Sequence, residues 1–364
     1  MYAELRVQHG VAPRVARVDE VRSGLLILGF GGRVGTGVRE ARVSDLATLE
    51  LTAQQWGADP VTHAAARVFL REGTRDLTLW LVPTERAGTG SAVAVWDQIR
   101  ARASDLRSAV GLLAGPALPV LCDGEALAAA QSVLLDVADR HDALALVDPP
   151  RSGTQLTRWG ELLAERAAPH LGCGASWWPW LQGPAGVLPP GVHVGALMAR
   201  LSEGSLGPGR APANLPLPGA LAPEGRVGAV ELRQVGGCGM NVIRALPGVG
   251  VTPWGAVTLG HRQGLSAIVA RRVYGIAVER LRQVGERALF EPVTSGLRGA
   301  VQRRAFSALQ GMAAEGLLVA GPDDPGFFVR CEVSSAPSPQ VRVYARLRPV
   351  ASVDSVEVDV VLTA

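Results

Sequence analysis

The order of apolar and polar positions in the first half of the chain predicts alternating strands and helices. Short apolar runs bounded by turn residues are typical of buried strands, and apolar positions recurring every three or four residues are typical of amphipathic helices. The runs predict strands at residues 23–30, 77–82, 118–122, 143–147 and 176–180. The helical spacing predicts helices at residues 62–72, 125–140 and 157–168. This alternation is typical of an α/β layer.

The second half of the chain has a different order of elements. A segment rich in proline and glycine at residues 184–223 precedes a short helix. Two long helices are expected at residues 266–286 and 297–318, and strands follow at residues 326–333 and 340–347. The predicted fold class is therefore α/β with an α+β part, in which mixed sheets are flanked by helices and strand arms extend at both ends.

Each end of the chain carries a strand pattern without a nearby partner. Apolar residues alternate with polar ones at the N-terminus (Ala3, Leu5 and Val7) and near the C-terminus (Val356, Val358, Val360 and Leu362). A lone strand is not stable by itself. The N-terminal segment must therefore be donated to another element or be disordered, and the C-terminal segment is free to pair with another chain. We expect both terminal strands to complete a sheet of a neighbouring copy of the chain.

The basic residues exclude several classes of enzyme. The chain has no lysine, so all 36 of its basic residues are arginine. A P-loop needs a lysine on the phosphates and a Schiff-base enzyme needs a lysine amine, so neither class fits. The net charge of +3 is small, and the arginines are interleaved with 33 acidic residues. Nucleic-acid binding, which needs a clustered basic face, is not expected.

Cysteine spacing and hydropathy predict where the protein is made. The four cysteines, Cys122, Cys173, Cys238 and Cys331, show no C-x-x-C spacing, which favours free thiols in a reducing cytoplasm. No apolar run approaches the roughly 18 residues of a membrane span, and the N-terminus has no signal pattern. We expect assembly in the cytoplasm and no insertion into a membrane.

No residue pattern predicts a catalytic, cofactor or metal site. The glycines between Gly29 and Gly35 lack the spacing of a dinucleotide loop. Asp123 and Asp148 follow predicted strands, where α/β enzymes place their sites, and His141 or His193 could act as a base. No nucleophile elbow or zinc-binding helix motif accompanies them. Capping of a turn or helix is the favoured role of both aspartates, and an α/β enzyme using them is a further alternative.

One stretch, residues 240–272, carries a specific pattern. It contains Met240-Asn241-Val242-Ile243-Arg244, then Pro247-Gly248-Val249-Gly250, then Trp254-Gly255-Ala256-Val257-Thr258-Leu259, and finally Arg271-Arg272. Three further pieces flank it in order: Trp177-Trp178-Pro179-Trp180-Leu181, Arg210-Ala211-Pro212-Ala213-Asn214 and Phe290-Glu291-Pro292. Together they resemble the C-terminal part of contractile tail sheath proteins, found in phage tails, tailocins and related injection systems. The sequence departs from the family at Val257, where arginine is usual, and in the entry motif at residues 11–15.

The resemblance implies a structural protein and a division into domains. We expect an N-terminal arm at 1–20, the N-terminal part of an inner domain at 21–85 and a middle α/β domain of subtilisin-like fold at 86–235. A C-terminal sheath domain at 236–348 and a C-terminal arm at 349–364 would follow. Trp178, Trp180 and Trp254 are expected to be core residues that dock the middle and C-terminal domains.

The resemblance also implies partners. Copies of the chain would form hexameric rings and a helical sheath around an inner tube, joined by strand exchange, with baseplate and tail-terminator proteins at the ends. Contraction would drive the tube through a target envelope, and lysis would release the particle. The candidate tube contacts are arginines on the two long helices: Arg271, Arg272, Arg298, Arg303 and Arg304. A baseplate-proximal or specialised paralogue of the sheath protein is the alternative.

Overall fold

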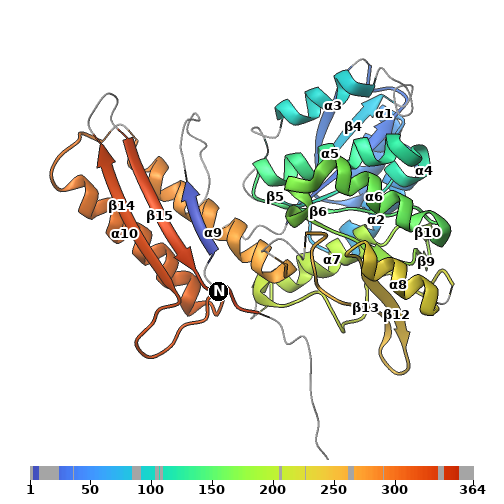
Figure 1. Cartoon of the computed structure of the whole chain (residues 1–364). Helices are drawn as coiled ribbons and strands as arrows, with labels where there is room; N and C mark the ends of the chain where they lie inside the picture. The colour runs from blue at the N-terminus through green and yellow to red at the C-terminus, as the bar shows by residue number, and fades with distance from the viewer. Residues whose placement is uncertain are drawn as a thin grey trace, which may run out of the picture.

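The computed structural model describes residues 3–7, 24–35, 37–83, 92–102, 106, 110–204, 207–225, 227–260, 266–289, 291–334 and 340–351. These residues form a large lobe and a small lobe, with a long helix, α9, running from one to the other (Figure 1). The mixed α/β fold predicted from the sequence is confirmed. No described helix is long and apolar enough to cross a membrane.

A six-stranded sheet forms the centre of the large lobe. Its order is β3-β4-β2-β5-β6-β7, and neighbouring strands are parallel except for β3, which runs antiparallel to β4 at one edge. The strands are β2 (Gly24–Gly31), β3 (Arg39–Val43), β4 (Leu77–Pro83), β5 (Val110–Ala114), β6 (Leu144–Leu146) and β7 (Gly174–Ala175).

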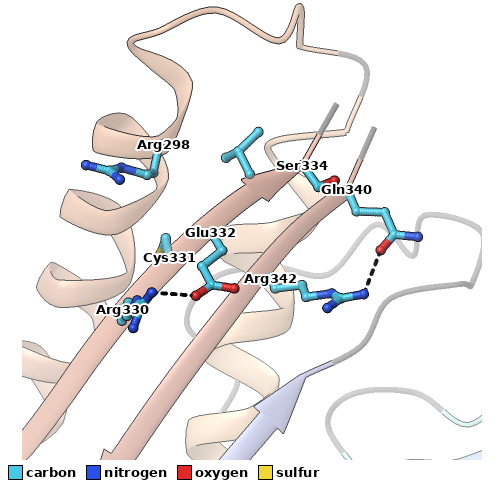
Figure 2. A pocket seen from close by; sticks show the side chains of 8 residues that line it. Arg298, Arg330, Cys331, Glu332, Ser334, Gln340 and Arg342 are labelled. Carbon is cyan, nitrogen blue, oxygen red and sulfur yellow. Dashed lines mark hydrogen bonds and ion pairs between the residues drawn. The ribbon is translucent and has the colours of Figure 1, made fainter. Parts of the chain in front are cut away.

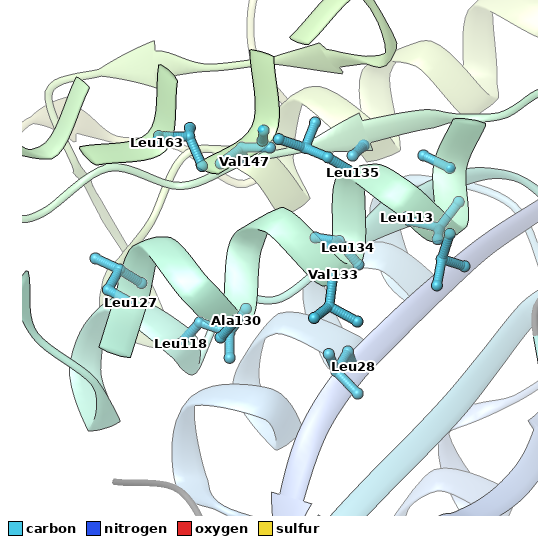
Figure 3. Packing of buried hydrophobic residues seen from close by; sticks show 14 of the residues in the cluster. Leu28, Leu113, Leu118, Leu127, Ala130, Val133, Leu134, Leu135, Val147 and Leu163 are labelled. Carbon is cyan, nitrogen blue, oxygen red and sulfur yellow. The ribbon is translucent and has the colours of Figure 1, made fainter. Parts of the chain in front are cut away.

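Helices cover both faces of this sheet. One apolar cluster joins Leu26 and Leu28 of β2 to α3 (Ala92–Ala101), α5 (Gly124–Arg140) and α6 (Leu156–Ala167). Figure 3 shows Leu28 facing the side chains of α5 in this cluster. A second cluster joins Leu25 and Ile27 to the helices of the opposite face, α2 (Pro60–Glu72) and α7 (Gly191–Ser202). Because β2 is buried on both faces, its sequence is a continuous apolar run rather than an alternation.

Two aspartates cap the first two helices. Asp45 caps α1 (Leu46–Trp56), since its carboxylate accepts a hydrogen bond from the Thr48 N–H at 2.8 Å. Asp59 caps α2 in the same way and also accepts a hydrogen bond from the Phe30 N–H, which ties the helix to the end of β2.

Residues of the sequence motif form a second, smaller sheet in the large lobe, in the order β13 (Gly250–Trp254), β12 (Asn241–Leu246) and β8 (Trp177–Trp178). The Asn241 side chain fixes it, because its amide donates to the carbonyls of Ser176 and Val257 at 3.1 and 2.9 Å and its oxygen accepts from the Val257 N–H at 2.9 Å. Gly255 has a φ of +138°, and a Cβ there would lie 2.7 Å from the Asn241 oxygen. The motif's asparagine and Trp-Gly step therefore have a structural function.

Short elements complete the large lobe. They are α4 (Leu118–Leu121), β8 (Trp177–Trp178), β9 (Leu181–Gly183), β10 (Gly186–Leu188), β11 (Ala222–Pro223), α8 (Ala229–Gly237), β12 (Asn241–Leu246) and β13 (Gly250–Trp254).

The small lobe is built from the end of the chain and one strand from its beginning. Its sheet has the order β1-β15-β14, with antiparallel neighbours throughout. The elements are β1 (Ala3–Val7), α9 (Ile268–Glu286), α10 (Leu297–Ala314), β14 (Phe327–Ser334) and β15 (Gln340–Leu347). A third apolar core lies between the two helices and one face of β14 and β15.

Two expectations about this architecture differ from the structure. A strand was expected at residues 118–122, but residues 118–121 form the short helix α4, with Pro119 in its first turn. The strand of this region is β5, which lies earlier in the chain at residues 110–114. β2, β4 and β5 also belong to one sheet, so the expected division near residue 85 crosses a single folded unit. β12 and β13 of the expected C-terminal domain lie in the large lobe, where β12 pairs with β8.

Candidate assembly surfaces

The N-terminal strand lies at one edge of the small lobe's sheet. β1 pairs with β15 of the same chain, with Ala3, Leu5 and Val7 opposite Leu347, Ala345 and Val343. The partner residues on β15 are all buried. In the single chain this strand lies at an edge of its own sheet, and its expected pairing with a neighbouring copy stays a prediction. The expected C-terminal arm residues, Val356, Val358, Val360 and Leu362, lie outside the described residues.

The opposite edge of this sheet is β14, which pairs only with β15 among the described strands. Arg298 of α10 and Arg330 of β14 line an open cleft of about 390 Å³ near the end of this strand. Figure 2 shows both arginines beside β14, and Arg342 on the neighbouring strand. Arg330 pairs with Glu332 at 2.7 Å, whereas no described residue forms an ion pair with Arg298. This edge thus combines unpaired backbone with excess positive charge.

Among the described residues, helices cover only one face of the same sheet. Along β14, Phe327, Val329 and Cys331 are buried, whereas Arg330 is exposed and Phe328 is 58% exposed. β15 alternates in the same way, and Arg342 and Arg346 are exposed. A strand that is half covered needs only one apolar face, which explains the period of two in its sequence.

The α10 arginines are on the surface, as the predicted contact with an inner tube would require. Arg298, Arg303 and Arg304 are all exposed. Arg304 forms an ion pair with Glu291 at 3.2 Å, while Arg298 and Arg303 have no ion pair within the described residues. A contact of this helix with a tube stays a prediction.

Arg271 and Arg272 were expected at the same contact, and this placement is wrong. They are only 4% and 7% exposed, because α9 lies between the lobes and these two side chains point into the large lobe. Arginines in an amphipathic pattern are usually solvated, and nothing in the sequence distinguishes this buried pair.

The three tryptophans that were expected in the core have different environments. Trp178 and Trp180 are buried, as expected, and the Trp180 indole donates to the Pro149 carbonyl at 3.0 Å. Trp254 is 46% exposed at the end of β13, with the Arg244 guanidinium 5.5 Å from its ring centre. The expectation that Trp254 is a core residue is therefore wrong, since Trp254 is the last residue of β13 and lies at the surface, beyond the buried residues 251–253 of the strand.

The candidate catalytic aspartates are differently placed. Asp123 is exposed at the N-cap position of α5, without a side-chain hydrogen bond to the helix. Asp148 is buried and caps α7, because one of its oxygens accepts from the Gly191 N–H at 2.7 Å. Burial raises the pKa of Asp148 to about 7, against the lowering effect of this hydrogen bond. Its second oxygen has no partner within the described residues.

The two histidines offered as bases are also internal. His141 and His193 are buried. A ring nitrogen of His193 lies 2.8 Å from the Pro218 carbonyl oxygen, and burial lowers its pKa, which favours the neutral ring. Gly29 is likewise structural, because a Cβ there would collide with Thr62 on α2. These contacts are those of packed polar residues.

The cysteines are free thiols, as predicted. Three are buried and Cys238 is half-buried. Burial raises the pKa of Cys122 and Cys331 to about 11 and that of Cys173 to about 12, so these thiols stay protonated at neutral pH. Within the described residues, no group of three or more His, Cys, Asp or Glu side chains could hold a metal ion.

Comparison with solved structures decides the fold. One match is the contracted helical sheath of the anti-feeding prophage, with a TM-score of 0.71 and 20% identity over 98% of this chain and 99% of that chain. The chain has the fold of a contractile sheath protein. The sheath complex of an extracellular contractile injection system matches with a TM-score of 0.66 and 17% identity over 98% of both chains. A sheath tail protein of Desulfitobacterium hafniense matches at 0.59 with 8% identity, over 94% of this chain and 100% of that one.

No family model and no curated protein matches the sequence. Structural matches over nearly the whole chain include both lobes, so the fold of the entire protein is shared.

Proposed function

We propose that this chain is a protomer of a contractile sheath and polymerises helically around an inner tube. The observation that carries the proposal is the nearly full-length match to the contracted anti-feeding prophage sheath. Such a match includes the relative placement of both lobes, which a resemblance in one common α/β domain would not require. The role is structural, and contraction would drive the tube through a target envelope.

Strand exchange at the small lobe would link the copies. The edge position of β1 can be filled by the same strand of another copy, as in domain swapping. The 16 residues between β1 and β2 span at most about 50–60 Å when fully extended, which is enough to reach a neighbour. The segment 353–362 would pair with the β14 edge, where Asp354, Glu357 and Asp359 would meet the positive charge of Arg298 and Arg330.

The remaining partners follow from this role. The inner tube would contact the exposed α10 arginines Arg298, Arg303 and Arg304. Hexameric rings of the chain would stack into the sheath, which would begin at a baseplate and end at a tail terminator. The phage tail-like particle would be assembled in the cytoplasm and released by lysis.

A baseplate-proximal paralogue is the second candidate. This candidate is kept because the chain also matches two anti-feeding prophage baseplate structures, with TM-scores of 0.72 and 0.73 and identities of 18% and 20%. These values are close to the one for the helical sheath, so they do not favour one role over the other.

The proposal is tested by expressing the full chain alone and separating assemblies by sedimentation before electron microscopy. A sheath protomer is expected to give long tubes of repeating subunits. A baseplate-proximal paralogue would give single rings or short stacks. Monomers alone at every protein concentration and salt concentration would contradict both roles.

A further inference from the structure

Helix α9 belongs to both lobes. Its residues Val273, Ala277 and Leu281 pack in the small lobe's core, while Ile268 at its start packs in the core of the large lobe. Figure 1 shows this helix running from the large lobe along the small lobe's sheet. The polar side chains that α9 turns towards the large lobe are therefore placed to control how the lobes are joined.

Arg272 enters the end of helix α7 in the large lobe. Its guanidinium donates to the Met198 carbonyl at 3.4 Å and to the Ser202 hydroxyl, and that hydroxyl donates to the same carbonyl at 2.8 Å. The C-terminal end of a helix carries partial negative charge and therefore favours a nearby cation. No described acidic residue forms an ion pair with Arg272. Burial lowers its pKa to about 10, so it remains charged at neutral pH.

Two more arginines of α9 contact the turn between α5 and β6. The Arg271 guanidinium donates to the Ala143 carbonyl at 3.3 Å and lies 5.2 Å from the ring centre of Tyr274. Arg282 pairs with Asp142 of the large lobe at 3.1 Å and with Glu279 of its own helix at 3.0 Å. Three arginines thus contact two separate places on the large lobe.

We propose that Arg271, Arg272 and Arg282 form a joint that fixes the orientation of the small lobe on the large lobe. A guanidinium presents its donors in a rigid plane, so the bonds from Arg271 Nε and Arg272 Nη2 to the large lobe form in only one orientation of the lobes. Arg271 Nη2 and Arg272 Nη1 have no hydrogen-bond partner among the described residues. A buried charge that loses these partners is strongly unfavourable, which opposes intermediate orientations. The joint thereby positions α10 and the β14 edge relative to the rest of the protomer. This last consequence rests on the proposed sheath function, whereas the joint itself is a property of the single chain.

The joint is tested by measuring the distance between the lobes in the full chain, kept dilute and monomeric. Spin labels are attached at Leu51→Cys on α1 and Val319→Cys in the small lobe, both exposed, with Cys238→Ala to avoid labelling the half-buried thiol. The variant is Arg272→Met. Its matched control is Arg280→Met, because Arg280 lies on the same helix but pairs with Glu315 inside the small lobe at 2.8 Å.

The expected result is one narrow distance distribution for the unmutated joint and for Arg280→Met, and loss of that single peak in Arg272→Met. If Arg272→Met does not fold, Arg282→Met replaces it, since that pair is only partly buried. If the distance distribution of every folded joint variant stays as narrow as that of Arg280→Met, the proposed joint is refuted.

Assembly of the same variants separates the joint from the sheath function. If the joint positions the assembly surfaces, Arg272→Met or Arg282→Met forms fewer tubes than Arg280→Met, although the lobes stay folded by circular dichroism. Normal tubes from a variant with a broadened distance would overturn the positioning role while leaving the joint. Absence of tubes from the unmutated chain would contradict the sheath function and leave the distance result unaffected.

Discussion

The two lobes differ in how completely they bury their sheets. The central sheet of the large lobe is covered by helices on both faces, and all eight residues of β2 are buried. The sheet of the small lobe is covered on one face, and no described strand pairs with the outer side of β14. An uncovered edge invites pairing with another chain. The large lobe thus covers both faces of its central sheet, while the small lobe leaves one face of its sheet and the β14 edge available for joining copies.

The arginines of the two long helices show the same difference. On α9, Arg271 and Arg272 are buried and hydrogen-bonded to the large lobe, whereas Arg298 and Arg303 on α10 are exposed without an ion pair to a described residue. Arginine therefore joins the two lobes on α9, whereas on α10 it is available to contact a partner. Position in the fold decides between these uses.

The largest expected effect comes from removing the strand that would complete the β14 edge. Deletion of residues 352–364 is expected to abolish tubes and leave the monomer folded. About five backbone hydrogen bonds at a net 0.5–1.5 kcal/mol each would be lost, roughly 3–7 kcal/mol per arm before ordering costs. Sedimentation and circular dichroism measure both results. Deletion of residues 363–364 alone, which spares the strand pattern, is the control, and normal tubes from the longer deletion would refute strand exchange at this end.

Within the large lobe, the tryptophans provide the next test. Trp178→Ala is expected to lower the free energy of unfolding by about 3–5 kcal/mol, because Trp178 is buried. Trp254→Ala should change it by less than about 1 kcal/mol, since an exposed side chain has little packing to lose. Urea unfolding of both variants checks the pair. Equal losses of unfolding free energy in the two variants would show that Trp254 is packed as tightly as Trp178.

How far the sequence predicts this fold depends on the kind of signal. Long amphipathic helices and half-covered strands have clear periodicity, and β15 occupies the predicted residues 340–347. The apolar pattern predicted the wrong element at residues 118–122, where the structure has a short helix and not a strand. A short apolar run does not distinguish a strand from a helical turn. The burial of Arg271 and Arg272 and the exposure of Trp254 depend on contacts between distant segments, which a local pattern does not contain. Motif resemblance indicated the sheath fold but not what each motif residue contacts.

A pH effect is expected from the large lobe alone. The pKa of Asp148, about 7 in the folded protein against a usual 3.8, means that the native state binds a proton that the unfolded state has released. The free energy of unfolding should therefore fall by up to about 1.4 kcal/mol per unit as pH rises from about 4 to 7, and level off above that. Asp148→Asn should remove this slope and be more stable than the unmutated chain at pH 8. Urea unfolding at several pH values checks it, and parallel curves would contradict the assignment.

The smallest expected effect per residue is at α10. Arg303→Glu with Arg304→Glu is expected to weaken assembly on the inner tube without unfolding the monomer. Exposed ion pairs contribute about 0–1 kcal/mol each, so only their sum over many copies becomes visible. Co-sedimentation with tube protein at low and high salt measures it, and the difference should shrink at high salt because exposed charges are screened. Unchanged assembly at both salt concentrations would show that this helix does not face the tube.

The most direct test of the central claim is cryo-electron microscopy of the particle from cells that produce this chain. The account predicts a helical outer layer into which the large lobe fits as one body. In that layer, the β14 edge of each small lobe should pair with a strand from another copy. An outer layer built from a different protein, or small lobes of this chain with the β14 edge unpaired, would contradict it.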